Sequence, residues 1–269
     1  MKNVIKMLAV AGLMTAGFAQ AAVPADINAA PGVLFVNWNA TAAMAGKANP
    51  MLEVRDESGD LVASVHANLM GTQQVQIPSR TQGNLTVSQS WFRDSQQGIL
   101  TAADPSIRVY VTRSTFTGLG TCENDAGCAH SLYIGDIGSL TVRESRFERG
   151  TGGHYLKARA AEVVIEGNSF DDANGRTTNY MIDLPAGSRG RIIDNWFVQG
   201  RDKENYSTFI ALGAEDLLHP SDGLQVVNNE ARFVPGLTRQ TAFFADWTGS
   251  RIVMQGNKLA AGIKQYDQR

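Results

Sequence analysis

The sequence predicts an all-β protein, a single-stranded right-handed parallel β-helix (a solenoid) with an N-terminal cap. Two observations predict this fold. A repeat of about one coil length runs through residues 81–269, and almost every copy ends on an aromatic or aliphatic residue at the same phase. Repeats with periods of roughly 20 to 50 residues are typical of solenoids and related arrays, in which each unit is stable only when stacked on its neighbours.

The repeat reads apolar, any residue, apolar, any two residues, Asn or Ser, any residue, and then Phe or another apolar residue. Its seven copies place the Asn or Ser at Ser90, Ser114, Ser145, Asn168, Asn195, Asn229 and Asn257. These positions are separated by 24, 31, 23, 27, 34 and 28 residues, so the longer intervals indicate coils with inserted loops.

Each part of the repeat has a physical reason. The two apolar residues at i and i+2 form the inward face of a short strand, because side chains alternate along a strand. The Asn or Ser lies where the chain turns a corner, since its short polar side chain bonds to backbone groups and Asn tolerates a left-handed conformation. The following Phe returns to the core, where the rings of successive coils stack. An antiparallel sandwich is the alternative, but it predicts hairpin turns and no Asn-x-Phe at a constant phase.

The first residues predict export. Lys2 and Lys6 form a short positive region before an apolar run over residues 7–18, and residues 19–21 read Ala-Gln-Ala, the pattern of a signal-peptidase site. A membrane anchor is the alternative, although the run is shorter than the roughly 20 residues that span a bilayer. We therefore expect a signal peptide in residues 1–21 with cleavage near Ala21, a cap and first coils in 22–80, and a periplasmic or secreted protein.

The two cysteines agree with export. Cys122 and Cys128 flank a short polar loop, which in an oxidising compartment predicts a disulfide. A metal site is the weaker reading, because no second pair of ligands lies nearby in the sequence. The net charge of −2 indicates no nucleic-acid partner, since such binders carry a basic face. No later segment is apolar for long enough to cross a membrane, and the oligomeric state is not determined.

Three consecutive coils contain the most polar strands of the repeat, in residues 129–134, 153–159 and 179–184. Aligned on their inward residues, they place Tyr133, Lys157 and Asp183 in one outward column, with neighbours one strand spacing apart. We expect an exposed patch on this face. Arg159 shares the face of Lys157, and the column before the strands contains His130 and His154, with Tyr155 and Tyr180 beside them.

This group suits chemistry on an acidic polysaccharide. Lys and Arg neutralise the carboxylate of a uronate unit, and removal of the adjacent C5 proton needs an electron sink and a base. The residues expected to act in catalysis are Lys157, Arg159, Tyr133 and His154. The residues expected to bind substrate are His130, Asp183, Tyr155 and Tyr180. A pairing of Lys157 with Asp183 would keep the lysine charged and leave Tyr133 or His154 as the base.

The coil period and the Asn and Phe ladders resemble the pectate-lyase-like superfamily of parallel β-helix proteins over roughly residues 80–260. The resemblance implies a Lys or Arg base on a parallel sheet, often with calcium held by acidic residues. No cofactor is identified, and the sequence offers no clear ligand cluster for calcium, because the acidic pair at residues 171–172 is too short a signal. Residues 153–159, which read Gly-His-Tyr-Leu-Lys-Ala-Arg, also resemble the histidine-containing strand of mannuronan C5-epimerases. Residues 128–130 read Cys-Ala-His where those enzymes have Asp-Pro-His, so the histidine is kept and the aspartate is absent.

Three alternatives remain open from the sequence. The first is a non-catalytic carbohydrate-binding or envelope protein that uses the same face, with the inserts at 117–130 and 199–222 as the walls of a groove. The second is a glycosidase with Asp183 and either Glu215 or Asp136 as its two carboxyl groups. The third is an ordinary exposed strand face, on which a Lys–Asp pair contributes little to stability.

Overall fold

The computed structural model describes residues 84–122 and 127–269, and in residues 1–83 it describes only the backbone of six strands. These strands are β1 (Ile5–Lys6), β2 (Ala25–Ala30), β3 (Val33–Trp38), β4 (Met51–Arg55), β5 (Leu61–His66) and β6 (Thr72–Gln76). Strands β2, β3 and β6 form one antiparallel sheet, and β4 pairs with β5. The predicted signal peptide and its cleavage near Ala21 otherwise lie outside the described residues.

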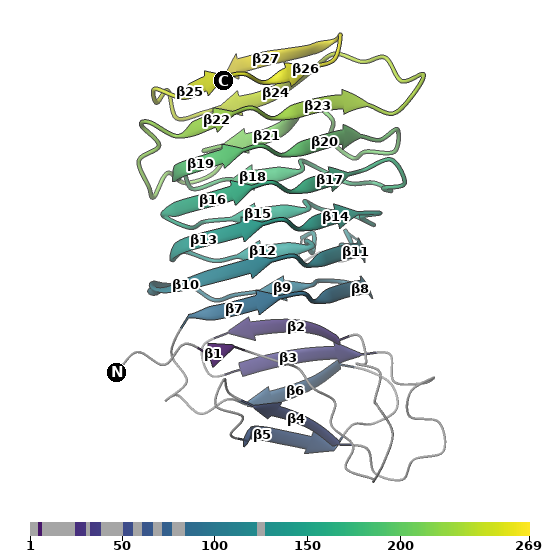
Figure 1. The fold of residues 1–269 in the computed structure, drawn as a ribbon, viewed down its shortest axis with the longest axis vertical. Coiled ribbons are helices and arrows are strands. Elements are labelled where there is room, and N and C mark those ends of the chain that lie inside the picture. Colours follow the sequence, from purple (N-terminus) through teal and green to yellow (C-terminus); the bar gives the residue numbers. More distant parts are fainter. Residues whose placement is uncertain are drawn as a thin grey trace.

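Three parallel sheets build the rest of the chain, and each coil contributes one strand to each sheet (Figure 1). The first sheet contains β7 (Leu85–Ser88), β10 (Asp104–Thr112), β13 (Ile137–Arg143), β16 (Glu162–Glu166), β19 (Arg189–Ile193), β22 (Gln225–Val227) and β25 (Val253–Gln255), with β1 beside β7. The second contains β8 (Trp91–Ser95), β11 (Thr115–Leu119), β14 (Arg146–Glu148), β17 (Ser169–Asp171), β20 (Trp196–Gln199), β23 (Glu230–Phe233) and β26 (Lys258–Leu259). The third contains β9 (Ile99–Leu100), β12 (Leu132–Ile134), β15 (Leu156–Ala158), β18 (Ile182–Leu184), β21 (Thr208–Leu212), β24 (Thr241–Asp246) and β27 (Ile263–Gln268).

This arrangement confirms the parallel β-helix and excludes the antiparallel sandwich for residues 85–268, where all strand pairs between coils are parallel. Figure 1 shows the coils stacked along one axis, with β25, β26 and β27 at one end and the six N-terminal strands at the other. Strand β2 lies against β8 and β9, at the end of the stack where the cap is expected. Within the described residues no helix has the length and apolar character needed to span a membrane.

A stack of aromatic rings on the inner face of the second sheet forms one part of the core. Rings of Phe92, Phe116, Phe147, Phe170 and Phe197 are fully buried and stack in order, with centroids 4.7, 4.7, 4.8 and 5.0 Å apart. In the next coil the repeat has Ala231 in place of Phe. Rings from the third sheet fill the space, because Phe209 and Phe243 meet Phe197 edge-on at 6.3 and 5.6 Å.

The polar ladder runs along the corner between the first and second sheets. The backbone N–H groups of Ser145, Asn168 and Asn195 donate to the side-chain oxygens of Asn168, Asn195 and Asn229, at 2.9, 2.9 and 3.0 Å. The left-handed conformation expected of the Asn lies instead on the preceding residue, as at Asp194 with φ of 57°. The preceding residue makes the bend, while the Asn keeps its side chain aimed along the stack to join neighbouring coils.

Candidate functional site

The register of the third sheet brings the predicted column together. Tyr133 of β12 pairs with Lys157 of β15, and Lys157 pairs with Asp183 of β18, while Leu132, Leu156 and Ile182 occupy the inward column. The strand alignment expected from the sequence is therefore confirmed. The name third-sheet cluster is used below for Tyr133, Lys157, Arg159, Asp183, His130, His154, Tyr180 and Glu215.

The expectation that this patch is exposed is wrong for Lys157 and Asp183, whereas Tyr133 and Arg159 are half-buried. Lys157 retains 8% of its exposure and Asp183 only 3%, and both histidines are also buried. The alternative of an ordinary exposed strand face with a Lys–Asp pair is wrong for the same reason, because both residues of the pair are buried. Part of the cover comes from residues 213–221, which follow β21. The backbone N–H groups of Gly213, Glu215 and His219 donate to the carbonyls at the end of β18, those of Leu184, Pro185 and Ala186.

Glu215 closes the cluster from this segment. Lys157 Nζ donates to Glu215 Oε1 at 2.6 Å, and the guanidinium of Arg159 donates to Glu215 Oε2. Burial acts to raise the pKa of Glu215, but the hydrogen bonds and charges of Lys157 and Arg159 outweigh it and hold that pKa below its usual value. The sequence named Glu215 only as a glycosidase carboxyl group. It contains no periodic signal for this contact, because Glu215 lies in an insert between two strands.

Lys157 is held as an ammonium ion. Besides Glu215, it meets Asp183 Oδ2 at 3.2 Å. Burial acts to lower its pKa, yet the charges of Asp183 and Glu215 and their hydrogen bonds leave the pKa of Lys157 above its usual value. A protonated lysine cannot accept a proton. In this state Lys157 is a group that binds anions, and of the expected bases Tyr133 and His154 remain.

His154 and Asp183 form a buried pair, with His154 Nε2 3.4 Å from Asp183 Oδ2. Burial lowers the pKa of His154 well below its usual value, so the ring is neutral. Burial raises the pKa of Asp183 to about 6 against the opposing charge of Lys157. The atoms His154 Nδ1 and Asp183 Oδ1 are buried and have no hydrogen-bond partner. The tautomer with its proton on Nε2 directs that proton at the Asp183 carboxylate and leaves the Nδ1 lone pair unprotonated.

A column of three rings, those of His130, His154 and Tyr180, lies beside the column that contains Lys157 and Asp183. The rings of His130 and His154 lie 4.8 Å apart, and those of His154 and Tyr180 5.3 Å apart. The backbone N–H of His154 donates to His130 Nδ1 at 3.0 Å. Burial, together with the charges of Lys157 and Arg159, lowers the pKa of His130 to about 3. His130 is therefore neutral, and its remaining nitrogen, Nε2, carries its proton.

Tyr133 contacts both the ring of His130 and the charged side chain of Arg159. Its ring meets that of His130 edge-on at 4.9 Å, and the guanidinium carbon of Arg159 lies 5.4 Å from its ring centroid. Arg159 NH1 donates to the Tyr133 hydroxyl at 2.7 Å. Because the hydroxyl oxygen accepts this bond, its own proton is free to be donated to a ligand.

Tyr155 does not belong to the cluster, which corrects its expected role in binding substrate. Its side chain is buried, and its hydroxyl donates to Asp172 Oδ1 at 2.7 Å. The other carboxylate oxygen of Asp172 meets Lys203 Nζ at 3.2 Å, with both side chains fully buried. Alternation fails here because the chain bends at the corner before β15. Because Asp172 is paired with Lys203 and accepts a hydrogen bond from Tyr155, residues 171–172 do not offer a free pair of carboxylates for calcium.

His219 fixes the far end of the covering segment. Its Nε2 lies 3.0 Å from Asp136 Oδ1 and 3.1 Å from the backbone oxygen of Arg159. Of the carboxyl groups considered for a glycosidase, Asp136 is thus engaged by His219, and Asp183 and Glu215 are both engaged by Lys157. This arrangement does not favour the glycosidase alternative.

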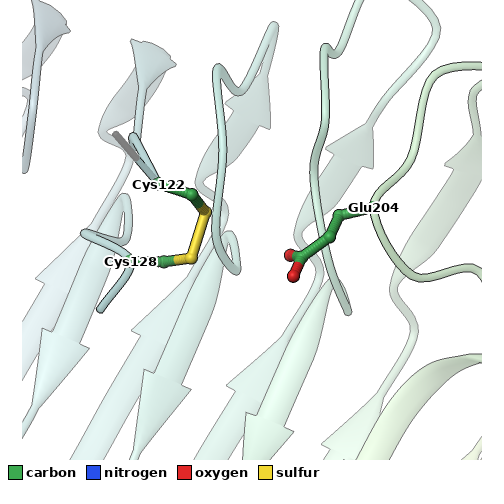
Figure 2. Close-up of side chains that lie close together, drawn as sticks. All are labelled: Cys122, Cys128 and Glu204. Atoms are coloured by element: carbon green, nitrogen blue, oxygen red, sulfur yellow. A yellow bond between two sulfur atoms is a disulfide. The ribbon is translucent and has the colours of Figure 1, made fainter. Parts of the chain in front are cut away.

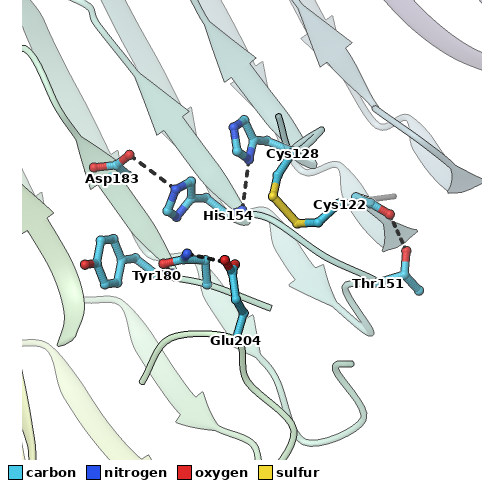
Figure 3. Close-up of a disulfide and its surroundings, with 10 residues drawn as sticks. Cys122, Cys128, Thr151, His154, Tyr180, Asp183 and Glu204 are labelled. Atoms are coloured by element: carbon cyan, nitrogen blue, oxygen red, sulfur yellow. Dashed lines mark hydrogen bonds and ion pairs between the residues drawn. A yellow bond between two sulfur atoms is a disulfide. The ribbon is translucent and has the colours of Figure 1, made fainter. Parts of the chain in front are cut away.

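The disulfide between Cys122 and Cys128 is present as predicted. Figure 2 shows Glu204 facing it from a later coil, and each of the three side chains has a ligand-type atom within 4.8 Å of the others. The two sulfurs are bonded to each other, so this group is not a thiolate metal site. Figure 3 shows the surroundings of the disulfide, Glu204 among them. Asn179 Nδ2 donates to Glu204 Oε2 at 2.9 Å. Asn205 Nδ2 donates to the Tyr180 hydroxyl at 3.0 Å, so the 199–222 insert borders the cluster on this side too.

A separate polar pocket of about 390 Å³ lies where strands β8, β11 and β14 of the second sheet end. It is lined by Asp94, Gly118, Arg149, Thr151, Asn174 and Arg176. It shares no residue with the third-sheet cluster and contains none of the residues expected from the sequence to act in catalysis or to bind substrate.

Comparisons with protein-family models, with curated proteins and with solved structures found no match to this chain. The parallel β-helix is therefore established by the strand register of the chain itself.

Proposed function

We propose that this protein is exported and binds uronate units of an acidic polysaccharide at the third-sheet cluster, where it abstracts the C5 proton as a lyase or an epimerase. One observation supports the proposal most directly. Lys157 and Arg159 both donate hydrogen bonds to a single carboxylate, that of Glu215. The neutral ring of His154 and the hydroxyl of Tyr133 lie next to these two cations. A uronate presents the same carboxylate on the carbon that bears the proton to be removed.

The two cations supply the electron sink. Removal of the C5 proton places negative charge on the carboxylate oxygens, and donors already aimed at those oxygens stabilise this charge most effectively. Arg159 stays charged at every working pH, and Lys157 is held charged by its acidic partners.

His154 and Tyr133 supply proton transfer. His154 Nδ1 accepts the C5 proton while Asp183, which faces Nε2, stabilises the imidazolium that forms. In a lyase the C5–H electrons form the C4=C5 double bond, the C4–O bond breaks, and the Tyr133 hydroxyl donates a proton to the leaving oxygen. In an epimerase a proton returns to C5 from the opposite face of the ring.

The disulfide between Cys122 and Cys128 supports the export part of the proposal, because such bonds persist in oxidising compartments. It also closes the loop that leads into His130, two residues beyond Cys128.

The test is ultraviolet absorbance during incubation with alginate, pectate and glycosaminoglycans, with and without calcium. A rise reports unsaturated uronate ends and identifies a lyase. Deuterium incorporation at C5 from heavy water, followed by nuclear magnetic resonance, identifies an epimerase. The Lys157→Ala/Arg159→Ala double variant should lose either activity, and Arg159→Ala alone, which keeps the buried Lys157–Asp183 pair, should lose it with the fold retained. Lys264→Ala, at an exposed site, serves as control. Flat absorbance without deuterium uptake on every polymer would contradict catalysis.

A second candidate function is glycan binding without catalysis. It is favoured by the burial of His154 Nδ1, because a nitrogen out of contact with solvent takes no substrate proton until the cluster opens. This function predicts saturable binding of an acidic glycan, measured by calorimetry, with no change in the glycan over long incubation.

A further inference from the structure

We propose that Glu215 is an internal occupant of a carboxylate site and determines specificity, because an acidic ligand enters by exchanging its own carboxylate for that of Glu215 on Lys157 and Arg159. This inference rests on the proposed function and names the step that precedes it.

The contacts of Glu215 are those of a bound acid. Its two oxygens divide between two cations, Oε1 on Lys157 and Oε2 on Arg159. Arg159 in turn donates to the Tyr133 hydroxyl, so a carboxylate in this position is set next to the group that can protonate a leaving oxygen. A ligand carboxylate with the same two contacts would be placed in the same way.

Glu215 is the most accessible member of this group. Its side chain is 43% exposed, compared with 10% for Lys157 and 25% for Arg159. The backbone around it is fixed, since Glu215 N–H donates to Pro185 O and Leu218 N–H to Ala186 O. Rotation of the Glu215 side chain into water therefore opens the site without displacing the segment that carries it.

Charge balance makes the exchange selective. Asp183 is the remaining acidic partner of Lys157, so loss of Glu215 alone leaves two cations facing one buried carboxylate. A ligand carboxylate restores the balance, whereas a neutral sugar cannot, and unpaired buried charge is costly. The site is thereby closed to neutral glycans and open to acidic ones.

Glu215→Ala and Glu215→Gln test the proposal, with Glu230→Gln as an exposed control that changes the charge equally. The probes are galacturonate, acetate and glucose, followed by thermal unfolding and calorimetry on the full chain, with circular dichroism to confirm the fold. Emptying the site should let galacturonate and acetate stabilise Glu215→Ala. If Glu215 points away in about a tenth of wild-type molecules, galacturonate should bind this variant about tenfold more tightly than wild type. Glu215→Gln should behave similarly, and glucose and the control should show no effect.

Two results would overturn the proposal, and they differ in what they say of the proposed function. If neither Glu215 variant responds to the carboxylates while the wild type still binds or converts acidic polymers, Glu215 does not occupy the ligand site and the proposed function survives. If the variants take up galacturonate but the wild type neither binds nor converts any acidic polymer, the exchange does not occur and the proposed function fails with it.

Discussion

Lys157 Nζ and Glu215 Oε1 lie 2.6 Å apart although the two residues are 58 positions apart in the sequence. Strand register accounts for the place of Lys157 on β15, and an insert after β21 accounts for that of Glu215. The contact joins a repeated part of the fold to a part that does not repeat. Through this contact the outward side chains Lys157 and Arg159 are paired with a carboxylate from outside the repeat.

Breaking the buried Lys157–Asp183 pair should destabilise the protein. Lys157→Met leaves Asp183 without its nearest cation, and loss of one partner of a buried pair costs about 3–5 kcal/mol. Asp183→Asn should cost a similar amount, but the double variant should cost less than the sum of the two. Urea unfolding of all four proteins measures the coupling energy. Strictly additive costs would show that the pair is not coupled in the folded protein.

The pKa of His130 predicts a dependence of stability on pH. Its folded pKa of about 3 lies below the unfolded value near 6.5, so the unfolded chain binds the proton first as pH falls. The contribution of His130 is fully present above pH 6.5 and is lost progressively toward pH 3. His130→Asn keeps an acceptor for the His154 N–H and cannot titrate. Its free energy of unfolding should therefore vary less between pH 4 and 6.5 than that of the wild type, and equal slopes would contradict the burial of a neutral ring.

Removal of one ring from the aromatic stack should be costly. Phe147 is fully buried between Phe116 and Phe170, so Phe147→Ala leaves a cavity and should lower the free energy of unfolding by about 3–5 kcal/mol. Leu217→Ala, at a residue that is 55% exposed, should change it by less than about 0.5 kcal/mol. Equal effects of the two changes in urea unfolding would show that the stack does not support the fold.

The disulfide should stabilise its loop. Cys122 and Cys128 are six residues apart, and closing so short a loop contributes about 2 kcal/mol. The Cys122→Ser/Cys128→Ser variant should unfold at a lower temperature, by the same amount as the wild type kept reduced. Mass spectrometry of the untreated protein should detect no free thiol, and two free thiols would refute the bond.

The sequence alone was sufficient for the fold and for the column that holds the cluster. Both follow from periodicity: a constant phase of Ser145, Asn168 and Asn195 sets the corner, and the alternation of side chains then places Tyr133 over Lys157. The disulfide could be predicted too, because its two cysteines lie close together in the chain.

Only the tertiary structure decided which of these side chains are covered and what they contact. The path of an insert follows no period, so neither the contact of Glu215 with Lys157 nor that of His219 with Asp136 is encoded in the repeat. Tyr155 turned inward for a related reason, since a bend at a corner breaks the alternation from which its direction was inferred. Periodic contacts are determined locally within each coil, whereas the burial of the cluster depends on residues that meet only when the coils have stacked.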